Sequence, residues 1–326
     1  MLSVIVPAYN ERENIENTAA VLSDILRKNG TEFELMFVDD GSSDNTWELI
    51  EKLSERDSSI RGLHFSRNFG KEGAIFAGLR RCVGDCAVVI DCDLQHPPEL
   101  IPEMLRLHEQ GYEVVEAIKS SRGKESLMYR LFAKTFYRIM KSSSDVDLDR
   151  ASDFKLMDRK VIDALNDLPE RITFFRALSS WVGFKTVKVE FEVAPRNAGT
   201  TKWNFRKLLK FALNNITSFT NFPMQIVTIL GTLFLLFALV MGIQSLVKYF
   251  GGQALEGFTT VNILILLSAA VIMRALGIIG YYMSKIYEEI KFRPRYIISE
   301  DTRDKKNKET KDKDRKEQDS ANGKNS

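Results

Sequence analysis

The sequence predicts an α/β fold with a mainly parallel sheet, followed by an interfacial helix and a two-helix transmembrane hairpin. The first two-thirds of the chain alternates short apolar runs with amphipathic segments, the order typical of parallel sheets. A basic amphipathic segment follows near residue 203. Beyond it lie two apolar stretches, each long enough to cross a membrane.

The composition supports a folded chain. Of 326 residues, 44% are hydrophobic and 28% are charged, so a core can form and wholesale disorder is excluded. The net charge of +2 gives no reason to expect a nucleic-acid partner. The cysteines, Cys82, Cys86 and Cys92, have no second Cys or His cluster to complete a metal site. We expect them to be small buried residues in a reducing compartment.

The N-terminus shows no secretory signal. Met1 is followed at once by a strand-like run, without the basic start and long apolar region that export needs. We therefore expect the N-terminal region to stay in the cytoplasm.

Strands and helices alternate up to residue 117. Apolar runs predict strands over residues 2–6, 33–38, 62–65, 86–90 and 112–117. Amphipathic segments predict helices over residues 11–28, 44–56, 70–81 and 98–109, the last beginning with prolines. We expect an α/β domain over residues 1–202, with helices on both faces of the sheet and ligands at the carboxyl ends of the strands.

Residues 203–222 predict a basic amphipathic helix. Apolar side chains recur there at helical spacing, with Arg206, Lys207 and Lys210 elsewhere on the helical wheel. Such a helix suits a membrane interface, although a helix facing a protein core is the alternative.

Two helices that cross the cell membrane are predicted over residues 223–247 and 258–284. The first contains no charged residue and would extend roughly 37 Å, compared with about 30 Å for the core of a bilayer. Only Arg274 interrupts the second. Two spans form an anchor and are too few for a transporter.

Flanking charges predict the orientation of these spans. Lysines and arginines precede the first span and follow the second, whereas the short loop between them holds only Lys248. By the positive-inside rule, both ends face the cytoplasm. Residues 285–326 would form a charged cytoplasmic tail. The mixed-charge composition after Ile298 predicts that this tail is disordered from about residue 300 onward.

Two polar motifs follow the first two strands. Residues 4–11 run from a strand into a loop where Tyr9 can face a base and Glu11 can accept hydrogen bonds from a base or ribose. Asp39 and Asp40 follow the second strand, and one of them can accept hydrogen bonds from a nucleobase or ribose. A helix N-cap formed by one of the following serines is an equally natural interpretation of this turn.

A third motif, Asp-Cys-Asp-Leu-Gln, follows the apolar strand at residues 86–90. Asp91 and Asp93 can converge on one divalent cation, which prefers oxygen ligands, and Gln95 adds another oxygen. A cation shared with phosphate oxygens would neutralise the charge on a leaving nucleoside diphosphate. The motif therefore predicts a metal–diphosphate site rather than a surface turn.

Four dispersed residues complete the candidate set: Arg122, Asp153, Arg196 and Lys202. Arg and Lys side chains suit the phosphate groups of a donor or an acceptor. Each of them alone is more often a surface charge, so their assignment depends on the resemblance of the whole chain to a known family.

Seven segments keep the order and spacing of such a family. They read Val-Pro-Ala-Tyr-Asn-Glu, Val-Asp-Asp-Gly-Ser-Ser-Asp, Ser-Arg-Asn-Phe-Gly-Lys, Asp-Cys-Asp-Leu-Gln-His-Pro-Pro-Glu, Ser-Asp-Phe-Lys-Leu-Met-Asp-Arg, Arg-Asn-Ala-Gly-Thr-Thr-Lys-Trp and Lys-Ile-Tyr-Glu-Glu-Ile-Lys-Phe-Arg-Pro-Arg-Tyr. Through them the chain, up to about residue 298, resembles the polyprenyl-phosphate glycosyltransferases. This family includes the bacterial bactoprenol glucosyltransferases and dolichol-phosphate mannose synthase. The resemblance implies an inverting enzyme with the GT-A fold, in glycosyltransferase family 2.

The resemblance implies roles for most candidate residues. Those that would line the nucleotide pocket are Pro7, Tyr9, Glu11 and Asp40. The ligands of Mg²⁺ or Mn²⁺ would be Asp91, Asp93 and Gln95. Donor diphosphate or lipid phosphate would be bound by Arg196 and Lys202, with Asp153 on the acceptor side.

Two positions depart from the family pattern. Ser152 stands where the family commonly has glycine, which is a mild change. Tyr281 stands where it commonly has glutamate, which puts in doubt a role for a carboxylate within the membrane but not the chemistry.

The implied reaction is attack by a lipid phosphate oxygen on the anomeric carbon of a nucleotide sugar, with inversion. The expected acceptor is undecaprenyl phosphate, and the first expected donor is UDP-glucose, ahead of GDP-mannose, UDP-galactose and UDP-N-acetylglucosamine. A phosphate monoester is mostly anionic at neutral pH, its second pKa being about 6, so Asp153 is expected to position groups rather than act as a base. Asp93 is the second catalytic candidate, through the metal. The product would serve cell-wall glycan modification.

Other functions agree less well with the sequence. A processive polysaccharide synthase would carry a Gln-x-x-Arg-Trp element and more membrane spans. A dinucleotide oxidoreductase would carry a Gly-x-Gly-x-x-Gly turn after a strand. Neither motif is present. A non-catalytic membrane scaffold is the alternative from another class, although the intact Asp91 and Asp93 argue against it. A homo-oligomer is compatible with the sequence but is not indicated by it.

Overall fold

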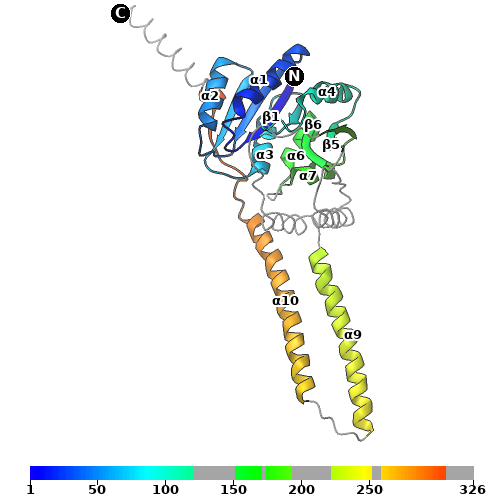
Figure 1. Ribbon diagram of the computed structural model, residues 1–326. Helices are drawn as coiled ribbons and strands as arrows, with labels where there is room; N and C mark the ends of the chain where they lie inside the picture. The colour runs from blue at the N-terminus through cyan, green and yellow to red at the C-terminus, as the bar shows by residue number, and fades with distance from the viewer. Residues whose placement is uncertain (121–150, 171–173, 193–221, 252–257, 306–326) are drawn as a thin grey trace, which may run out of the picture. The chain divides into compact units, whose positions relative to one another are not determined.

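The computed structural model describes residues 1–120, 151–170, 174–192, 222–251 and 258–305 (Figure 1). The chain divides into two compact units. The first, the α/β domain, comprises Met1–Arg130, Val146–Lys202 and Pro294–Ser326, and the second, the hairpin unit, comprises Leu131–Asp145 and Trp203–Arg293. The α/β domain is therefore built from segments on both sides of the hairpin in the sequence.

Within the described residues, eight strands form one sheet in the order β7-β5-β6-β4-β1-β2-β3-β8. They are β1 (Leu2–Ala8), β2 (Phe33–Asp39), β3 (Ile60–Phe65), β4 (Cys86–Val89), β5 (Val114–Lys119), β6 (Ala151–Asp158), β7 (Thr186–Phe191) and β8 (Ile298–Asp301). The central strands β4, β1, β2 and β3 are parallel, as predicted, and so is the pair β5–β7. The pairs β4–β6, β5–β6 and β3–β8 are antiparallel.

Helices cover both faces of this sheet (Figure 1). They are α1 (Ile15–Lys28), α2 (Thr46–Arg56), α3 (Lys71–Arg81), the 3₁₀ turn η1 (Pro98–Leu100), α4 (Ile101–Glu109), α6 (Arg159–Asp167) and α7 (Phe175–Trp181). Successive side chains of a strand point to opposite faces. Leu2 and Val4 of β1 pack in one cluster with α1, α2 and α4, whereas Ile5 meets α3 on the opposite face.

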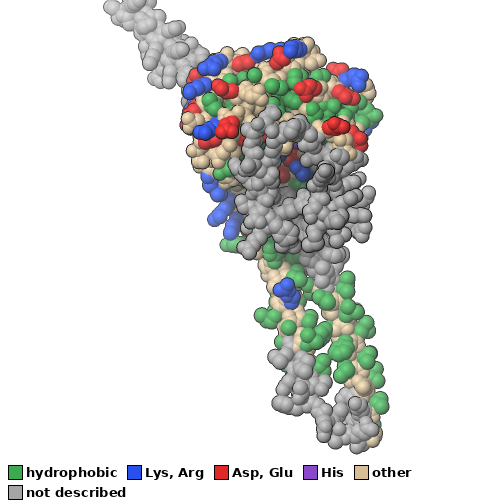
Figure 2. All heavy atoms as spheres, in the orientation of Figure 1, with side chains coloured by type: hydrophobic (Ala, Val, Ile, Leu, Met, Phe, Trp, Pro, Cys, Tyr) green, Lys and Arg blue, Asp and Glu red, His purple; other side chains and the backbone are tan. Residues whose placement is uncertain are grey.

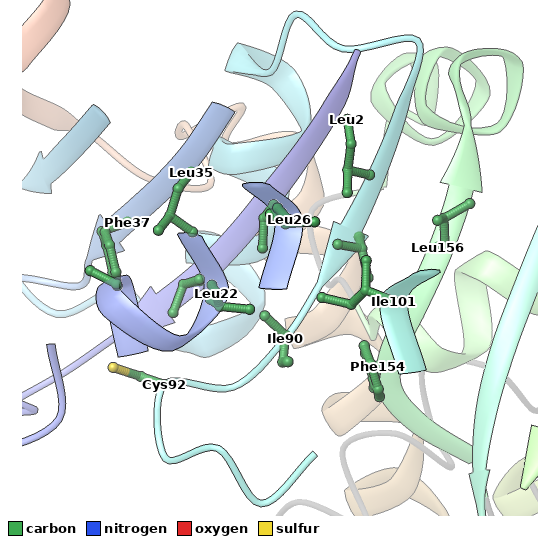
Figure 3. Packing of buried hydrophobic residues seen from close by; sticks show 14 of the residues in the cluster. Leu2, Leu22, Leu26, Leu35, Phe37, Ile90, Cys92, Ile101, Phe154 and Leu156 are labelled. Carbon is green, nitrogen blue, oxygen red and sulfur yellow. The ribbon is translucent and has the colours of Figure 1, made fainter. Parts of the chain in front are cut away.

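The core on the α1 face follows from helical periodicity. Ile15, Leu22 and Leu26 recur along α1 at intervals of seven and four residues, and all are buried. Leu22 and Leu26 pack in the same cluster as Leu35 and Phe37 of β2 (Figure 3). Burial of each such side chain contributes about 1.5–3 kcal/mol, so this face supplies much of the stability of the domain.

A glycine brings α3 close to the sheet on the other face. A Cβ atom at Gly78 would collide with the side chain of Ile5 in β1. Glycine is therefore required for α3 to lie directly on β1. This packing fixes α3 relative to the strand, and Lys71, the first residue of α3, is placed near the carboxyl edge of the sheet.

Three strands differ from the sequence prediction. β6 and β7 lie outside the predicted set, because charged residues such as Lys155 and Lys188 interrupt their apolar patterns. β8 corrects the expectation of disorder after Ile298, since this segment pairs with the edge of β3. A polar segment can form this strand because its Asp301 makes a buried ion pair with Arg61, with 2.6 Å between Oδ2 and Nη2.

The described part of the hairpin unit contains two long helices, α9 (Phe222–Phe250) and α10 (Phe258–Ile290), which contact each other. Hydrophobic side chains project along the visible described part of both helices, with tan backbone and other side chains between them (Figure 2). By length and composition, Val227–Gln244 and Leu267–Ile290 could each cross a membrane. Residues 203–221 of the predicted interfacial helix lie outside the described residues.

Candidate active site

The predicted acidic motifs lie at the carboxyl edge of the central strands, as expected for a parallel sheet. Ala8, at the end of β1, pairs with Asp39 at the end of β2. The backbone N–H of Asp40 donates to the Ala8 carbonyl over 2.9 Å. Next to them, β4 leads through Ile90 into Asp91. The ends of three parallel strands thus bring Tyr9, Asp40 and Asp91 to one edge.

The loops after β1 and β2 hold each other in place. The side-chain oxygen of Asn10 accepts a hydrogen bond from the Ser43 backbone over 2.9 Å. The backbone N–H of Glu11 donates to the Thr46 hydroxyl over 3.0 Å. Tyr9 remains 43% exposed, so its ring is available to a ligand. Pro7, by contrast, is buried within β1.

Asp40 organises the start of α3. Its buried carboxylate accepts backbone hydrogen bonds from Phe69 over 2.6 Å and from Gly70 over 2.9 Å. Gly70 has a φ of 97°, in the region that favours glycine. Burial raises the pKa of the Asp40 carboxyl, and the two backbone donors oppose this shift. In this structure Asp40 therefore supports the loop that leads to Lys71.

Asp39 is also engaged within the protein. It is buried and accepts a hydrogen bond from the Ser42 hydroxyl. Its Oδ2 lies 2.5 Å from Nδ1 of His64, whose ring stacks on Trp47. The nucleotide-binding role of Asp39 and Asp40 stays a prediction.

Four charged residues form a compact group that we call the ion cluster: Lys71, Asp91, Asp153 and Arg176. The Lys71 Nζ lies 2.5 Å from Asp91 Oδ1 and 2.7 Å from Asp153 Oδ2. Arg176 of α7 donates to both carboxylate oxygens of Asp153, from Nε over 2.7 Å and from Nη2 over 2.9 Å. The cluster thus joins α3, the loop after β4, β6 and α7 at the carboxyl edge of the sheet.

The charges of the cluster set the protonation of its carboxylates. Burial alone would raise the pKa of Asp153, but Lys71 and Arg176 hold it well below its usual range. The pKa of Asp91 is likewise lowered, because Lys71 and His96 outweigh the effect of burial. The same attractions raise the pKa of Lys71 against the effect of burial. Asp153 is therefore ionised at neutral pH and is a weak base.

Two further titratable groups border the cluster. Burial and the negative charge of Asp153 raise the pKa of Glu72 to about 7, although its carboxylate accepts a hydrogen bond from the Phe175 backbone over 2.7 Å. Lys155, two residues along β6 from Asp153, is buried against Glu116 with 3.0 Å between Nζ and Oε1. Burial lowers the pKa of Lys155.

The predicted metal ligands do not by themselves make a metal site within the described structure. Asp93 Oδ1 accepts a hydrogen bond from the Gln95 backbone over 3.1 Å, which holds the loop after Asp91 in a tight turn. Among the described residues, no group of three or more His, Cys, Asp or Glu side chains is arranged to hold a metal ion. The oxygen donors of Asp91, Asp93 and Gln95 suit Mg²⁺ or Mn²⁺ only if other oxygens, such as those of a diphosphate, complete the shell.

Some residues of this site were not predicted from the sequence, and some predicted residues lie beyond the described part of the chain. Arg122, Arg196 and Lys202 belong to the latter group. Lys71 was missed as a site residue although it ends the Ser-Arg-Asn-Phe-Gly-Lys segment. Arg176 carries no local signal, because only the fold brings it to Asp153.

Comparison with known proteins identifies relatives along almost the whole chain. A YkcC protein of Bacillus subtilis, described as an uncharacterized glycosyltransferase, is 39% identical over 298 residues, covering 91% of this chain and 92% of that protein. A prophage bactoprenol glucosyl transferase homolog of Escherichia coli is 36% identical over 299 residues, covering 91% and 98%.

Among solved structures, glucosyl-3-phosphoglycerate synthase of Mycobacterium tuberculosis is similar at 20% identity and a TM-score of 0.46, covering 67% of this chain and 77% of that chain.

A family model agrees with these relatives. The model described as glycosyl transferase family 2 matches residues 3–165, which span β1 to the greater part of α6. These residues contain the acidic motifs and three members of the ion cluster. The α/β domain accordingly has the GT-A type of fold. With a matched catalytic domain and relatives that extend through the apolar helices, the chain belongs to glycosyl transferase family 2 and resembles the bactoprenol glucosyl transferases within it.

Proposed function

We propose that this glycosyltransferase moves a hexose from a nucleotide sugar onto a polyprenyl phosphate at the cytoplasmic face of the cell membrane. UDP-glucose is the first expected donor, with GDP-mannose, UDP-galactose and UDP-N-acetylglucosamine as alternatives. Undecaprenyl phosphate is the expected acceptor. Several relatives at about 36% identity are named bactoprenol glucosyl transferases, which supports both a glucosyl donor and a polyprenyl acceptor. The two long apolar helices support a membrane location.

The environment of Asp153 is the observation that carries the proposal. Its carboxylate is held by Lys71 and Arg176, and its pKa is well below the usual range. A neutral hydroxyl acceptor would need a base whose pKa lies near the working pH. A phosphate monoester needs none, since its second pKa is about 6 and it is largely anionic at pH 7. Asp153 itself therefore suits a phosphate acceptor, which needs no base, better than a hydroxyl acceptor that it would have to deprotonate.

The chemistry follows from this assignment. An acceptor phosphate oxygen forms a bond to the anomeric carbon while the bond from that carbon to the donor diphosphate breaks. The nucleoside diphosphate leaves with the electron pair, and the configuration is inverted. In this proposal Lys71 and Arg176 supply cationic groups beside the two anionic reactants, and Asp153 keeps both side chains in position.

Asp91, Asp93 and Gln95 would hold Mg²⁺ or Mn²⁺ together with the donor diphosphate. The cation would supply neutralisation of the charge that develops on the leaving group. Because the described protein ligands do not form a complete site, the affinity for the cation should depend on the nucleotide. Asp93 would contribute to the reaction by helping to hold this cation.

The nucleotide would bind at the loops after β1 and β2. The exposed ring of Tyr9 offers a stacking surface for the base, and Glu11 offers a carboxylate to the base or ribose. Asp39 and Asp40 would line the pocket or support it. The cations proposed to bind diphosphate or lipid phosphate are Arg122, Arg196 and Lys202.

A donor panel tests this function directly. Membranes containing the protein are incubated with undecaprenyl phosphate and, in turn, each of the four labelled nucleotide sugars, and label is measured in the lipid phase. We expect transfer from UDP-glucose, loss of transfer in Asp153→Asn, and normal transfer in Asp163→Asn, which alters an exposed carboxylate on α6. Absence of lipid-linked label with every donor would contradict the proposal.

A further inference from the structure

The segment that follows α10, residues 294–302, is part of the α/β domain, and we call it the return segment. Its strand β8 runs antiparallel to β3, with Asp301 opposite Leu63. Just before β8, the Ile297 carbonyl accepts a hydrogen bond from the Ser66 backbone over 3.1 Å. The return segment therefore extends the sheet and reaches the loop that begins after Phe65.

Buried polar contacts fix the far end of the return segment. The Arg61 guanidinium binds both carboxylate oxygens of Asp301, over 2.6 and 3.2 Å. The two side chains are only 10% and 3% exposed. The Gly62 backbone also donates to the Thr302 hydroxyl over 3.0 Å. These contacts hold β8 on β3 although its sequence is polar.

Aromatic contacts fix the near end of the return segment. The Tyr296 ring stacks on Phe65 with 5.2 Å between centroids and only 5° between planes. Phe65 in turn meets Phe69 edge-on, with centroids 5.8 Å apart. Arg295 lies over the ring of Phe76 in α3 at 5.1 Å. The return segment thus contacts both β3 and α3, the two elements joined by the loop at residues 66–70.

That loop leads directly into the ion cluster. Phe69 and Gly70 donate their backbone N–H groups to Asp40, and Lys71 follows as the first residue of α3. The long side chain of Lys71 must be ordered to contact Asp91 and Asp153 together, and ordering it costs conformational entropy. When the start of α3 is held in place, the Lys71 ammonium group can reach fewer other positions.

We propose that Tyr296 is a positioning residue for Lys71, so that sugar transfer depends on docking of the chain that leaves the second apolar helix. Tyr296 acts through its ring contact with Phe65, which in turn contacts Phe69, and is not itself assigned a contact with a reacting group. This inference rests on the proposed function for its kinetic consequence only. The positioning itself is a property of the loop and can be measured without turnover.

A double-mutant cycle tests the kinetic consequence. Tyr296→Leu should lower kcat/KM about tenfold, whereas Tyr296→Phe, which keeps the ring, should lower it less than about twofold. In the Lys71→Gln background, Tyr296→Leu should cost less than about a further twofold, because the group it positions is already absent. Equal losses in both backgrounds would overturn the proposal, since they would indicate a structural effect independent of Lys71.

Hydrogen exchange of the full-length protein provides a readout that needs no activity. Tyr296→Leu should accelerate exchange of the Phe69 and Gly70 amides, whose N–H groups bind Asp40. Lys305→Gln serves as the control, because it removes exposed ion pairs with Glu51 and with Glu300 at the far end of the return segment and leaves the ring stack intact. Unchanged exchange in Tyr296→Leu would overturn the positioning role. If no donor is used but exchange accelerates, the proposed function fails while the positioning role stands.

Discussion

At the scale of single residues, carboxyl groups of similar chemistry acquire different properties in this domain. Asp40 and Glu72 have raised pKa values, chiefly through burial. Asp153 is also buried, yet its pKa is lowered because Lys71 and Arg176 lie against it. Burial therefore sets the direction of the pKa shift for Asp40 and Glu72, whereas for Asp153 the two neighbouring cations outweigh burial. This difference lets an anionic Asp153 persist beside a Glu72 that titrates near neutrality.

The first residue-scale prediction concerns the cation. Asp93→Asn keeps the size of the side chain but removes a charge, so turnover should fall at least about a hundredfold, the scale of losing a key electrostatic stabiliser. Binding of Mn²⁺ by the wild type, followed by its paramagnetic signal, should be weak alone and stronger with UDP. Exposed Asp163 supplies the control, as Asp163→Asn. Near-normal turnover of Asp93→Asn, or of the wild type in EDTA, would contradict the assignment of Asp93 as a metal ligand.

The second residue-scale prediction concerns pH. The pKa of Glu72 rises from 4.5 to about 7 on folding, so between these values the folded protein binds more protons than the unfolded chain. Stability from this group is therefore present at low pH and decreases as pH rises through that window. Glu72→Gln keeps an oxygen that can accept from Phe175 and removes the titration. Its Tm relative to the wild type should rise between pH 5 and pH 8.

Exposed Glu99 provides the reference for this measurement. Glu99→Gln should leave the dependence of Tm on pH as in the wild type. A constant Tm difference between Glu72→Gln and the wild type from pH 5 to pH 8 would contradict the raised pKa of Glu72.

At the scale of elements, α3 is held at both ends by segments that are distant from it in the sequence. Gly78 lets the helix lie against Ile5 of β1, while Asp40 and the return segment hold the loop before Lys71. β8 protects the edge of β3 and depends on side-chain pairing, because its own sequence is polar. The edge that holds the ion cluster is therefore supported by elements that come before and after the apolar helices in the sequence.

The element-scale prediction concerns β8. Asp301→Ala leaves the buried Arg61 guanidinium without its carboxylate, a loss of about 3–5 kcal/mol when one partner of a buried pair is removed. Thermal unfolding should show a clear decrease in Tm. Lys305→Gln removes two more exposed ion pairs, with Glu51 and with Glu300 of β8, and should change stability by about 1 kcal/mol or less. Equal Tm values for the two variants would show that β8 contributes little to the fold.

At the scale of the whole molecule, the hairpin unit interrupts the α/β domain in sequence but not in fold. The chain leaves the domain after Lys202 and returns at Pro294. If α9 and α10 cross the membrane, both connections to the α/β domain must lie on the same side of the membrane as that domain. This requirement agrees with the positive-inside expectation for the flanking lysines and arginines.

The whole-molecule prediction concerns topology. In a cysteine-free background, an impermeant thiol reagent should label Gly252→Cys in intact cells and leave Ser320→Cys unlabelled. Ser320→Cys should become labelled once the cells are permeabilised. The reverse pattern would overturn the orientation and, with it, the cytoplasmic placement of the α/β domain.

The sequence by itself determined the parallel centre of the sheet, the position of the acidic motifs and the two long apolar helices. These features depend on local periodicity: buried parallel strands are continuous apolar runs, and the polar residues after them meet at one edge. Asp91 and Asp93 could be placed at that edge because β4 is such a run.

Only the tertiary structure decided which charges meet. Lys71 and Asp153 are separated by 82 residues and Arg61 and Asp301 by 240, so no local pattern connects either pair. The polar strand β8 also lacks an apolar signal, because its order comes from an ion pair and from backbone hydrogen bonds to β3. The protonation of Asp153 and the return of the chain to the catalytic domain are consequences of contacts between distant segments, which the sequence specifies only through the complete fold.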